Sequence, residues 1–74
     1  MYLDRKAVAG ERNSIQVYYE GNSVSDTEIM LNGDSIGETG RFGSLLFTVP
    51  DVDRLVVRTT TENLGTVEET YEVY

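Results

Sequence analysis

The chain contains no cysteine, no histidine and no tryptophan, and a single proline among its 74 residues. Without cysteine or histidine, disulfide bonds, thiol chemistry, imidazole acid–base catalysis and the usual zinc sites are excluded. No apolar run approaches the roughly 18 to 20 residues of a membrane-spanning helix, and the N-terminus has no signal-peptide core. These absences remove most classes of enzyme, and we expect this segment not to insert into a membrane.

Basic residues are scarce as well. Thirteen Asp and Glu residues face six Lys and Arg residues, which gives a net charge of −7, and Lys6 is the single lysine. A surface of this sign repels phosphate backbones, so we expect no nucleic-acid partner. Lysine depletion combined with acidic, Thr and Val enrichment resembles proteins of salt-loving archaea, in which salt screens the repulsion. An ordinary acidic domain with few lysines by chance is the alternative.

A chain of 74 residues has room for one domain, and such a chain buries only about 60% of the surface that its unfolded form exposes. We therefore expect a single β-sandwich domain over residues 1–74, monomeric in isolation, with residues 1–12 as an edge strand or a flexible arm. Because the sequence ends in a strand-like run at Tyr74, we also expect that it was excised from a longer protein.

Short runs of β-branched and aromatic residues recur along the chain and are separated by Gly, Asn, Asp and Pro. The runs lie at residues 15–19, 28–31, 45–49, 55–58 and 67–73. This spacing predicts an all-β sandwich or barrel with six strands, or seven if the N-terminal arm pairs. No helical periodicity persists over a full window.

Turn residues punctuate these runs. Asn32-Gly33 predicts a tight hairpin, because both positions tolerate positive φ. Gly37 predicts a bulge or a close backbone approach, and Pro50 ends a strand because it has no N–H to donate. Further turns are expected at residues 10–13, 21–23 and 62–65.

Period-two alternation assigns one face of each run to the core. The predicted core comprises Ile15, Val17, Ile29, Leu31, Leu45, Phe47, Val49, Leu55, Val57, Val67, Tyr71 and Val73, and Tyr19 shares the face of Ile15 and Val17. Glu69 falls on the apolar face of the last run. We place it near a sheet edge, because a buried unpaired carboxylate is costly.

Exposed aromatic residues are the first candidate for a binding surface. The candidates are Tyr2, Tyr18, Tyr19, Tyr71, Tyr74 and Phe42. Such side chains stack on sugars or anchor protein partners, although their preference for strands explains their presence equally well. Tyr19 and Tyr71 are expected in the core, so Tyr18 and Phe42 are predicted as the exposed binding residues.

Aspartates in turns are the second candidate. Asp51 and Asp53 flank one turn and Asp34 lies in the hairpin, and their oxygens are suitable calcium ligands. The favoured interpretation is structural, because Asp stabilises turns through bonds to its own backbone. We therefore predict no cofactor. A glycosidase would need two carboxylates across a cleft, and nothing in the sequence indicates one, so no enzymatic activity is expected.

The order of turns and strands resembles the immunoglobulin-like and transthyretin-like repeats of prokaryotic and archaeal surface proteins, of the carboxypeptidase-regulatory-like and bacterial Ig-like type. The resemblance covers about residues 15–74 and rests on Gly21, Val24, Asn32-Gly33, residues 37–39, Gly43 and residues 47–50. It implies a seven-stranded antiparallel Greek-key sandwich that serves as a spacer, stalk or interaction module. Residues 40–43 lack the aspartate that this loop usually carries, so no function of that aspartate transfers.

Together these observations predict a non-enzymatic Ig-like spacer or protein-interaction module of a larger secreted or membrane-anchored protein, extracellular or at the cell surface. Its partners would be other domains of the parent chain or a separate protein. The alternative is a carbohydrate- or calcium-binding module that uses the loops at one end of the sandwich.

Overall fold

The computed structural model describes residues 1–61 and 65–74, and these residues form strands, turns and bends without any helix. The strands are β1 (Tyr2–Leu3), β2 (Arg12–Gln16), β3 (Tyr18–Tyr19), β4 (Asn22–Ser23), β5 (Glu28–Leu31), β6 (Asp34–Glu38), β7 (Ser44–Thr48), β8 (Arg54–Thr61) and β9 (Gly65–Glu72). The all-β prediction is confirmed. The described residues form more strands than the six or seven expected, because the run at residues 15–19 is divided between β2 and β3, and β4 is an additional short strand paired with β3.

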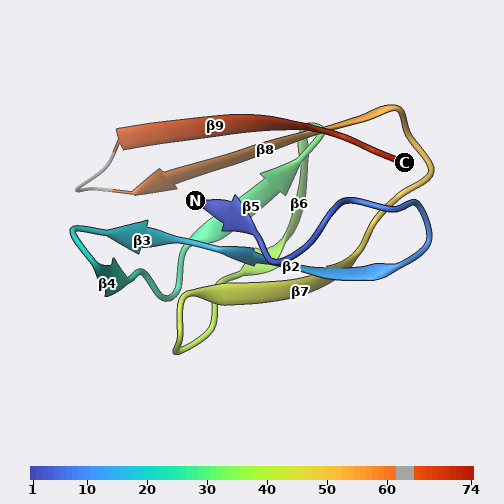
Figure 1. The fold of residues 1–74 in the computed structure, drawn as a ribbon. Helices are drawn as coiled ribbons and strands as arrows, with labels where there is room; N and C mark the ends of the chain where they lie inside the picture. The colour runs from blue at the N-terminus through green and yellow to red at the C-terminus, as the bar shows by residue number, and fades with distance from the viewer. Residues whose placement is uncertain (62–64) are drawn as a thin grey trace.

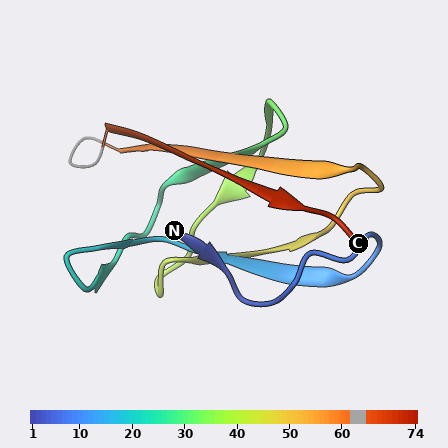
Figure 2. The same ribbon diagram turned by 45° about the horizontal axis from the view of Figure 1, so that its top comes forward.

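The strands form two main antiparallel sheets that lie against each other as layers (Figures 1 and 2). One sheet has the order β6-β5-β8-β9 and the other the order β1-β2-β7, while β3 and β4 form a small ladder of their own. The N-terminal arm pairs with β2, so it is an edge strand. No helix that could cross a membrane is found among the described residues.

The core lies between the two layers. Its buried apolar residues are Ala7, Ile15, Val17, Ile29, Leu31, Phe47, Val49, Leu55 and Val57. All but Ala7 are among the predicted core residues, because period two separates the two faces of a strand. Of the remaining predicted residues, Leu45, Tyr71 and Val73 are partly buried against this core, and Val67 is also only partly buried. Each fully buried aliphatic side chain stabilises the fold by about 1.5 to 3 kcal/mol.

The predicted hairpin and bulge are both present in β5 and β6. Asn32 and Gly33 connect the strands with φ values of 50° and 89°, the left-handed pair that a two-residue hairpin of this type requires. The register then shifts: Gly37 pairs with Ile29 but Ser35 pairs with Met30, which leaves Ile36 as the extra residue. Gly37 has a φ of 134°, a conformation that favours glycine.

The predicted position of Tyr19 in the core is wrong. β2 ends at Gln16, and the Val17 N–H continues the β2–β7 register by donating to the Gly43 carbonyl at 2.8 Å. The Val17 carbonyl instead accepts the Val24 N–H at 3.0 Å, so the chain changes its pairing partner at this residue. β3 and β4 then form a separate hairpin around Glu20 and Gly21, with φ values of 51° and 82°. This hairpin extends past the end of the β1-β2-β7 sheet (Figure 1), and Tyr19 is 37% exposed.

Two further predicted turns lie at slightly different residues in the structure. The turn expected at residues 21–23 is centred earlier, on Glu20-Gly21. The turn expected at residues 10–13 is shorter, because Arg12 and Asn13 already belong to β2, where they pair with Thr48 and Phe47. The connection expected at residues 62–65 lies, apart from Gly65, outside the described residues.

The two layers are joined at one end by the C-terminal residue. Tyr74 donates its N–H to the Ala7 carbonyl at 2.8 Å and accepts a bond from the Ala9 N–H at 3.0 Å. The segment after β1 is thereby held beside the end of β9, so that residues from the first and last parts of the sequence meet on one side of the sandwich.

Candidate functional site

A groove of about 350 Å³ opens where the outer strands of the two sheets, β1 and β9, face the same side of the molecule. We call it the tyrosine groove. It is lined by Tyr2, Leu3, Arg5, Lys6, Ala7, Tyr71, Glu72 and Tyr74. Because the residues on its two sides come from opposite ends of the sequence, the groove exists only in the folded chain.

On the β1 side, two tyrosine rings stack. The centroids of the Tyr2 and Tyr18 rings lie 5.7 Å apart, and the ring planes are inclined by 11°. The exposed fraction is 49% for Tyr2 and 38% for Tyr18. The pKa of Tyr2 is raised. The largest cause is a hydrogen bond with the Tyr18 side chain, and desolvation and the charges of Tyr18 and Asp4 follow. Tyr2 is therefore held by its neighbour while its ring remains accessible.

On the β9 side, Tyr71 and Tyr74 differ in their surroundings. Tyr71 pairs with Leu55 and is half-buried at the edge of the core. This burial, with the charge of Glu69 as a second cause, raises the pKa of Tyr71. Tyr74 is exposed, and the Lys6 ammonium lies 4.1 Å from its ring centroid, a cation–π contact. The Tyr74 hydroxyl also donates to a Glu72 carboxylate oxygen at 3.3 Å.

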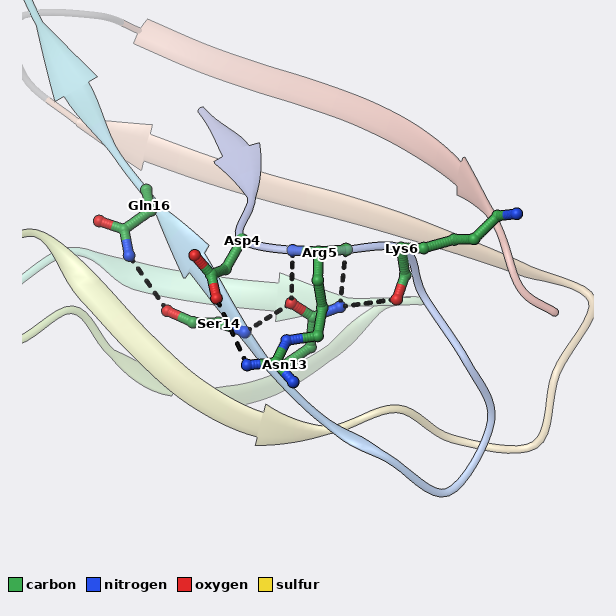
Figure 3. A network of polar contacts seen from close by, with 6 residues as sticks. All are labelled: Asp4, Arg5, Lys6, Asn13, Ser14 and Gln16. Carbon is green, nitrogen blue, oxygen red and sulfur yellow. Dashed lines mark hydrogen bonds and ion pairs between the residues drawn. The ribbon is translucent and has the colours of Figure 1, made fainter.

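A buried asparagine fixes the backbone that carries the basic residues of the groove (Figure 3). The Asn13 side-chain nitrogen donates to the Arg5 carbonyl at 3.0 Å and to the Lys6 carbonyl at 3.4 Å. Its oxygen accepts from the backbone N–H of Ser14 at 2.8 Å and of Arg5 at 3.4 Å. Asn13 is only 3% exposed. These bonds therefore satisfy polar groups that would destabilise the fold if they were buried without partners.

The groove has one basic and one acidic side. Arg5 and Lys6 follow β1, whereas Glu72 belongs to β9. Arg5 forms an exposed ion pair with Asp4 at 3.6 Å, a type of contact that contributes about 0 to 1 kcal/mol. The Arg5 guanidinium can therefore exchange Asp4 for a ligand at little cost to the fold.

The predicted exposure of Tyr18 and Phe42 is confirmed, and their role in binding stays a prediction. Phe42 is 74% exposed in the connection between β6 and β7, and does not line the groove. Tyr18 reaches the groove through its stacking on Tyr2. The two segments meet at Gly43, whose carbonyl accepts the Val17 N–H. Of the groove residues, sequence reasoning noted the tyrosines but missed Arg5, Lys6 and the supporting Asn13.

The three aspartates considered for calcium lie on the surface. Asp34 begins β6, and Asp51 and Asp53 lie in the connection between β7 and β8. Asp34 lines a second hollow of about 310 Å³ whose wall includes Ile36 and Val52, while Asp51 and Asp53 do not line it. Within residues 1–61 and 65–74, no group of three acidic side chains is placed to hold a metal ion.

Comparison with known proteins identifies no relative: no family model matches the chain, and no curated protein or solved structure matches it significantly. The resemblance to Ig-like repeats therefore stays a prediction, and the tyrosine groove is the structural feature that can indicate a function.

Proposed function

We propose that this chain is a non-enzymatic, Ig-like β-sandwich module with Greek-key connections that binds a protein partner through the tyrosine groove. The observation that carries the proposal is the gathering of Tyr2, Tyr71 and Tyr74 around one groove between two sheet edges. Tyrosine is enriched in protein interfaces because it combines a large apolar ring with a polar tip.

The arrangement of the rings supports binding over a purely spacing role. Tyr2 is stacked on Tyr18, and Tyr74 is covered by Lys6. Immobilising a side chain on binding costs about 0.5 to 1.5 kcal/mol, and rings that are already held in place lose less entropy. A spacer requires no such ordering of exposed aromatic residues.

The proposal includes a wider context. The module belongs to a larger secreted or membrane-anchored prokaryotic protein, archaeal in origin, and its partner is another domain of that protein or a separate protein at the cell surface. The acidic, lysine-poor composition and the order of turns and strands support this context.

A displayed library of random peptides tests the proposal. We expect the module to enrich a peptide family whose binding falls at least about tenfold, or about 1.4 kcal/mol, in a variant carrying Tyr2→Ser and Tyr18→Ser. The control is Tyr19→Ser, because Tyr19 is as exposed as Tyr18 but neither lines the groove nor belongs to the stacked pair of Tyr2 and Tyr18. Failure to enrich any peptide, or equal sensitivity to the control, would reject protein binding at the groove.

Carbohydrate binding is the second candidate, and the exposed, stacked faces of Tyr2 and Tyr18 together with Phe42 favour it. Aromatic faces of this kind stack on sugar rings. A glycan array followed by calorimetric titration separates the two functions: saturable binding of a glycan, lost in the same double variant, would favour the sugar. Calcium binding receives no such support, because no three carboxylates of the described residues are grouped so that they could hold a metal ion.

A further inference from the structure

β9 is the longest open edge that the two sheets leave in the described part of the chain. β9 has eight residues and pairs on one side only, with β8, without a shift in register. The other outer strands are shorter: β1 has two residues, β7 has five, and β6 has five and is interrupted by the bulge. An edge strand presents N–H and C=O groups that a further strand can pair with.

The register shows which β9 side chains an added strand would meet. Val67, Glu69 and Tyr71 pair with Thr59, Val57 and Leu55, all of which are buried. Directly opposed residues in an antiparallel ladder lie on the same face, so these three β9 positions are on the inner face. The inner side chains of an added strand would therefore extend toward the tyrosine groove, where Tyr71 contributes to the wall.

The charge of β9 restricts what can pair with it. The strand carries Glu68, Glu69 and Glu72 and no basic residue. Glu68 is bound by Arg58, with nitrogen–oxygen distances of 2.9 and 3.2 Å. Glu69 is exposed and forms no hydrogen bond or ion pair through its side chain with the residues that the structure describes. It is thus an acidic side chain on the inner face of an open edge, available to a cation.

A second copy of the chain is a poor occupant of this edge. Its own β9 would bring three more glutamates to the ladder, and like charges across strands are destabilising. The net charge of −7 on each copy adds to this repulsion. A basic strand of a different protein would instead gain from the same charges.

We propose that β9 accepts an extended basic strand from a protein partner by strand addition, with a lysine or arginine of the partner paired to Glu69 and its neighbouring apolar side chains entering the tyrosine groove. Main-chain hydrogen bonds then supply affinity and the alternating side chains supply specificity. This proposal rests on the proposed function, because it names the class of partner that the groove takes.

The probe is a synthetic peptide in which valine and lysine alternate and arginine replaces the central valine. Paired antiparallel with its centre at Glu69, it places valines beside Val67 and Tyr71 and lysines beside Glu68 and Glu72. NMR titration gives its Kd, and hydrogen exchange reports pairing. We expect alternate amides of β9 to exchange more slowly in the complex, because only every second N–H points away from β8.

Three protein variants and one modified peptide make the test specific. Glu69→Lys should weaken binding by about tenfold or more, and Glu69→Gln by a smaller factor. Glu38→Lys makes the same change of charge on β6, the bulged edge of the same sheet, and should change the Kd by less than about threefold, the effect of net charge alone. A peptide methylated on alternate backbone nitrogens keeps every side chain but cannot form a ladder, so it should not bind measurably. Thermal melts confirm that the variants are folded.

Each contrary result has a defined meaning. Equal binding of the methylated peptide, or no effect of Glu69→Lys, would show simple charge attraction and overturn the proposal. Slow exchange of β9 amides that appears without peptide and grows with protein concentration would assign the edge to a second copy, which also overturns it. If the peptide library yields tyrosine-dependent binders without basic residues, protein binding at the groove stands and strand addition is rejected.

Discussion

The Val56 backbone N–H donates to the side-chain oxygen of Asn32 at 2.7 Å, and the Asn32 backbone N–H donates to the Val56 carbonyl at 2.9 Å. The ladder between β5 and β8 runs through Leu31, which pairs with Val57. The Asn32 side chain therefore replaces a main-chain acceptor where the backbone turns away into the hairpin. Its nitrogen also donates to the Arg54 carbonyl at 3.1 Å. One residue thus makes the turn and extends the sheet.

Replacing Asn32 separates these two roles. Asn32→Gly keeps the positive φ but removes both side-chain bonds, and we expect a loss of about 1 to 3 kcal/mol, since each bond contributes roughly 0.5 to 1.5 kcal/mol. Asn32→Asp keeps the acceptor for Val56 and loses the donor to Arg54, so its stability should lie between glycine and wild type. Urea unfolding measures the order. A glycine variant as stable as wild type would show that these bonds contribute nothing.

Gly43 and Gly10 together separate the cost of a steric clash from the cost of backbone strain. A Cβ on this residue would lie 2.8 Å from the Val17 carbonyl oxygen and 3.0 Å from the Val24 nitrogen, and the φ of Gly43 is 76°. Gly10 has a similar φ of 84° but open space around the Cβ position. Gly10→Ala should therefore cost only the strain of about 1 to 3 kcal/mol, and Gly43→Ala distinctly more. Equal losses in thermal or urea unfolding would show that the β3–β4 hairpin yields to the added methyl group.

Local signals made the strands and the hairpin predictable. Asn32-Gly33 specifies its turn through φ values that few other pairs tolerate, and alternation identifies the buried face of β8 because the pattern and the ladder have the same period. The same rule failed at Tyr19. Alternation continues from Val17 to Tyr19 in the sequence, but the Val17 carbonyl already pairs with Val24, and β3 pairs with β4 instead of β7. Periodicity does not record this change of partner.

The tyrosine groove shows the corresponding limit for the site. Composition marked Tyr2 and Tyr18 as aromatic candidates, and alternation placed Tyr18 on the face opposite Ile15 and Val17. That Tyr2 and Tyr71 line one groove depends on how two sheet edges meet, and the residues lie near opposite ends of the chain. Asn13 was missed for a related reason: an asparagine near a glycine is an ordinary turn signal, and its buried role depends on the carbonyls of Arg5 and Lys6.

Ionisation of Tyr71 links stability to high pH. Burial raises its pKa above the ordinary value of about 10, so the unfolded chain releases the phenol proton first as pH rises. The folded state therefore loses stability as the pH rises above about 10 and passes through the raised pKa that Tyr71 has in the folded protein. We expect the melting temperature of Tyr71→Phe to fall less than that of wild type between about pH 9 and pH 11. The pKa of Tyr2 is raised too, so Tyr2→Phe should act in the same direction. Parallel curves for wild type and both variants would contradict this linkage.

Salt should stabilise the protein, because most acidic side chains that the structure describes form no ion pair. The described residues contain two ion pairs between side chains, Arg58 with Glu68 and Arg5 with Asp4, both exposed, against twelve acidic residues in the same part of the chain. The Debye length falls from about 10 Å at 0.1 M to about 3 Å at 1 M salt, which screens the repulsion. We expect the melting temperature to rise between low salt and about 1 M NaCl.

Stronger apolar burial at high salt would raise the melting temperature as well, so the two causes need separate measurements. Chloride and sulfate compared at matched ionic strength distinguish them, because screening depends on ionic strength whereas burial is strengthened more by sulfate. Equal rises in the two salts would assign the effect to screening of the carboxylates. A melting temperature that stays constant or falls with NaCl would show that repulsion does not limit this fold, and the proposed origin in a salt-loving organism would lose its physical basis.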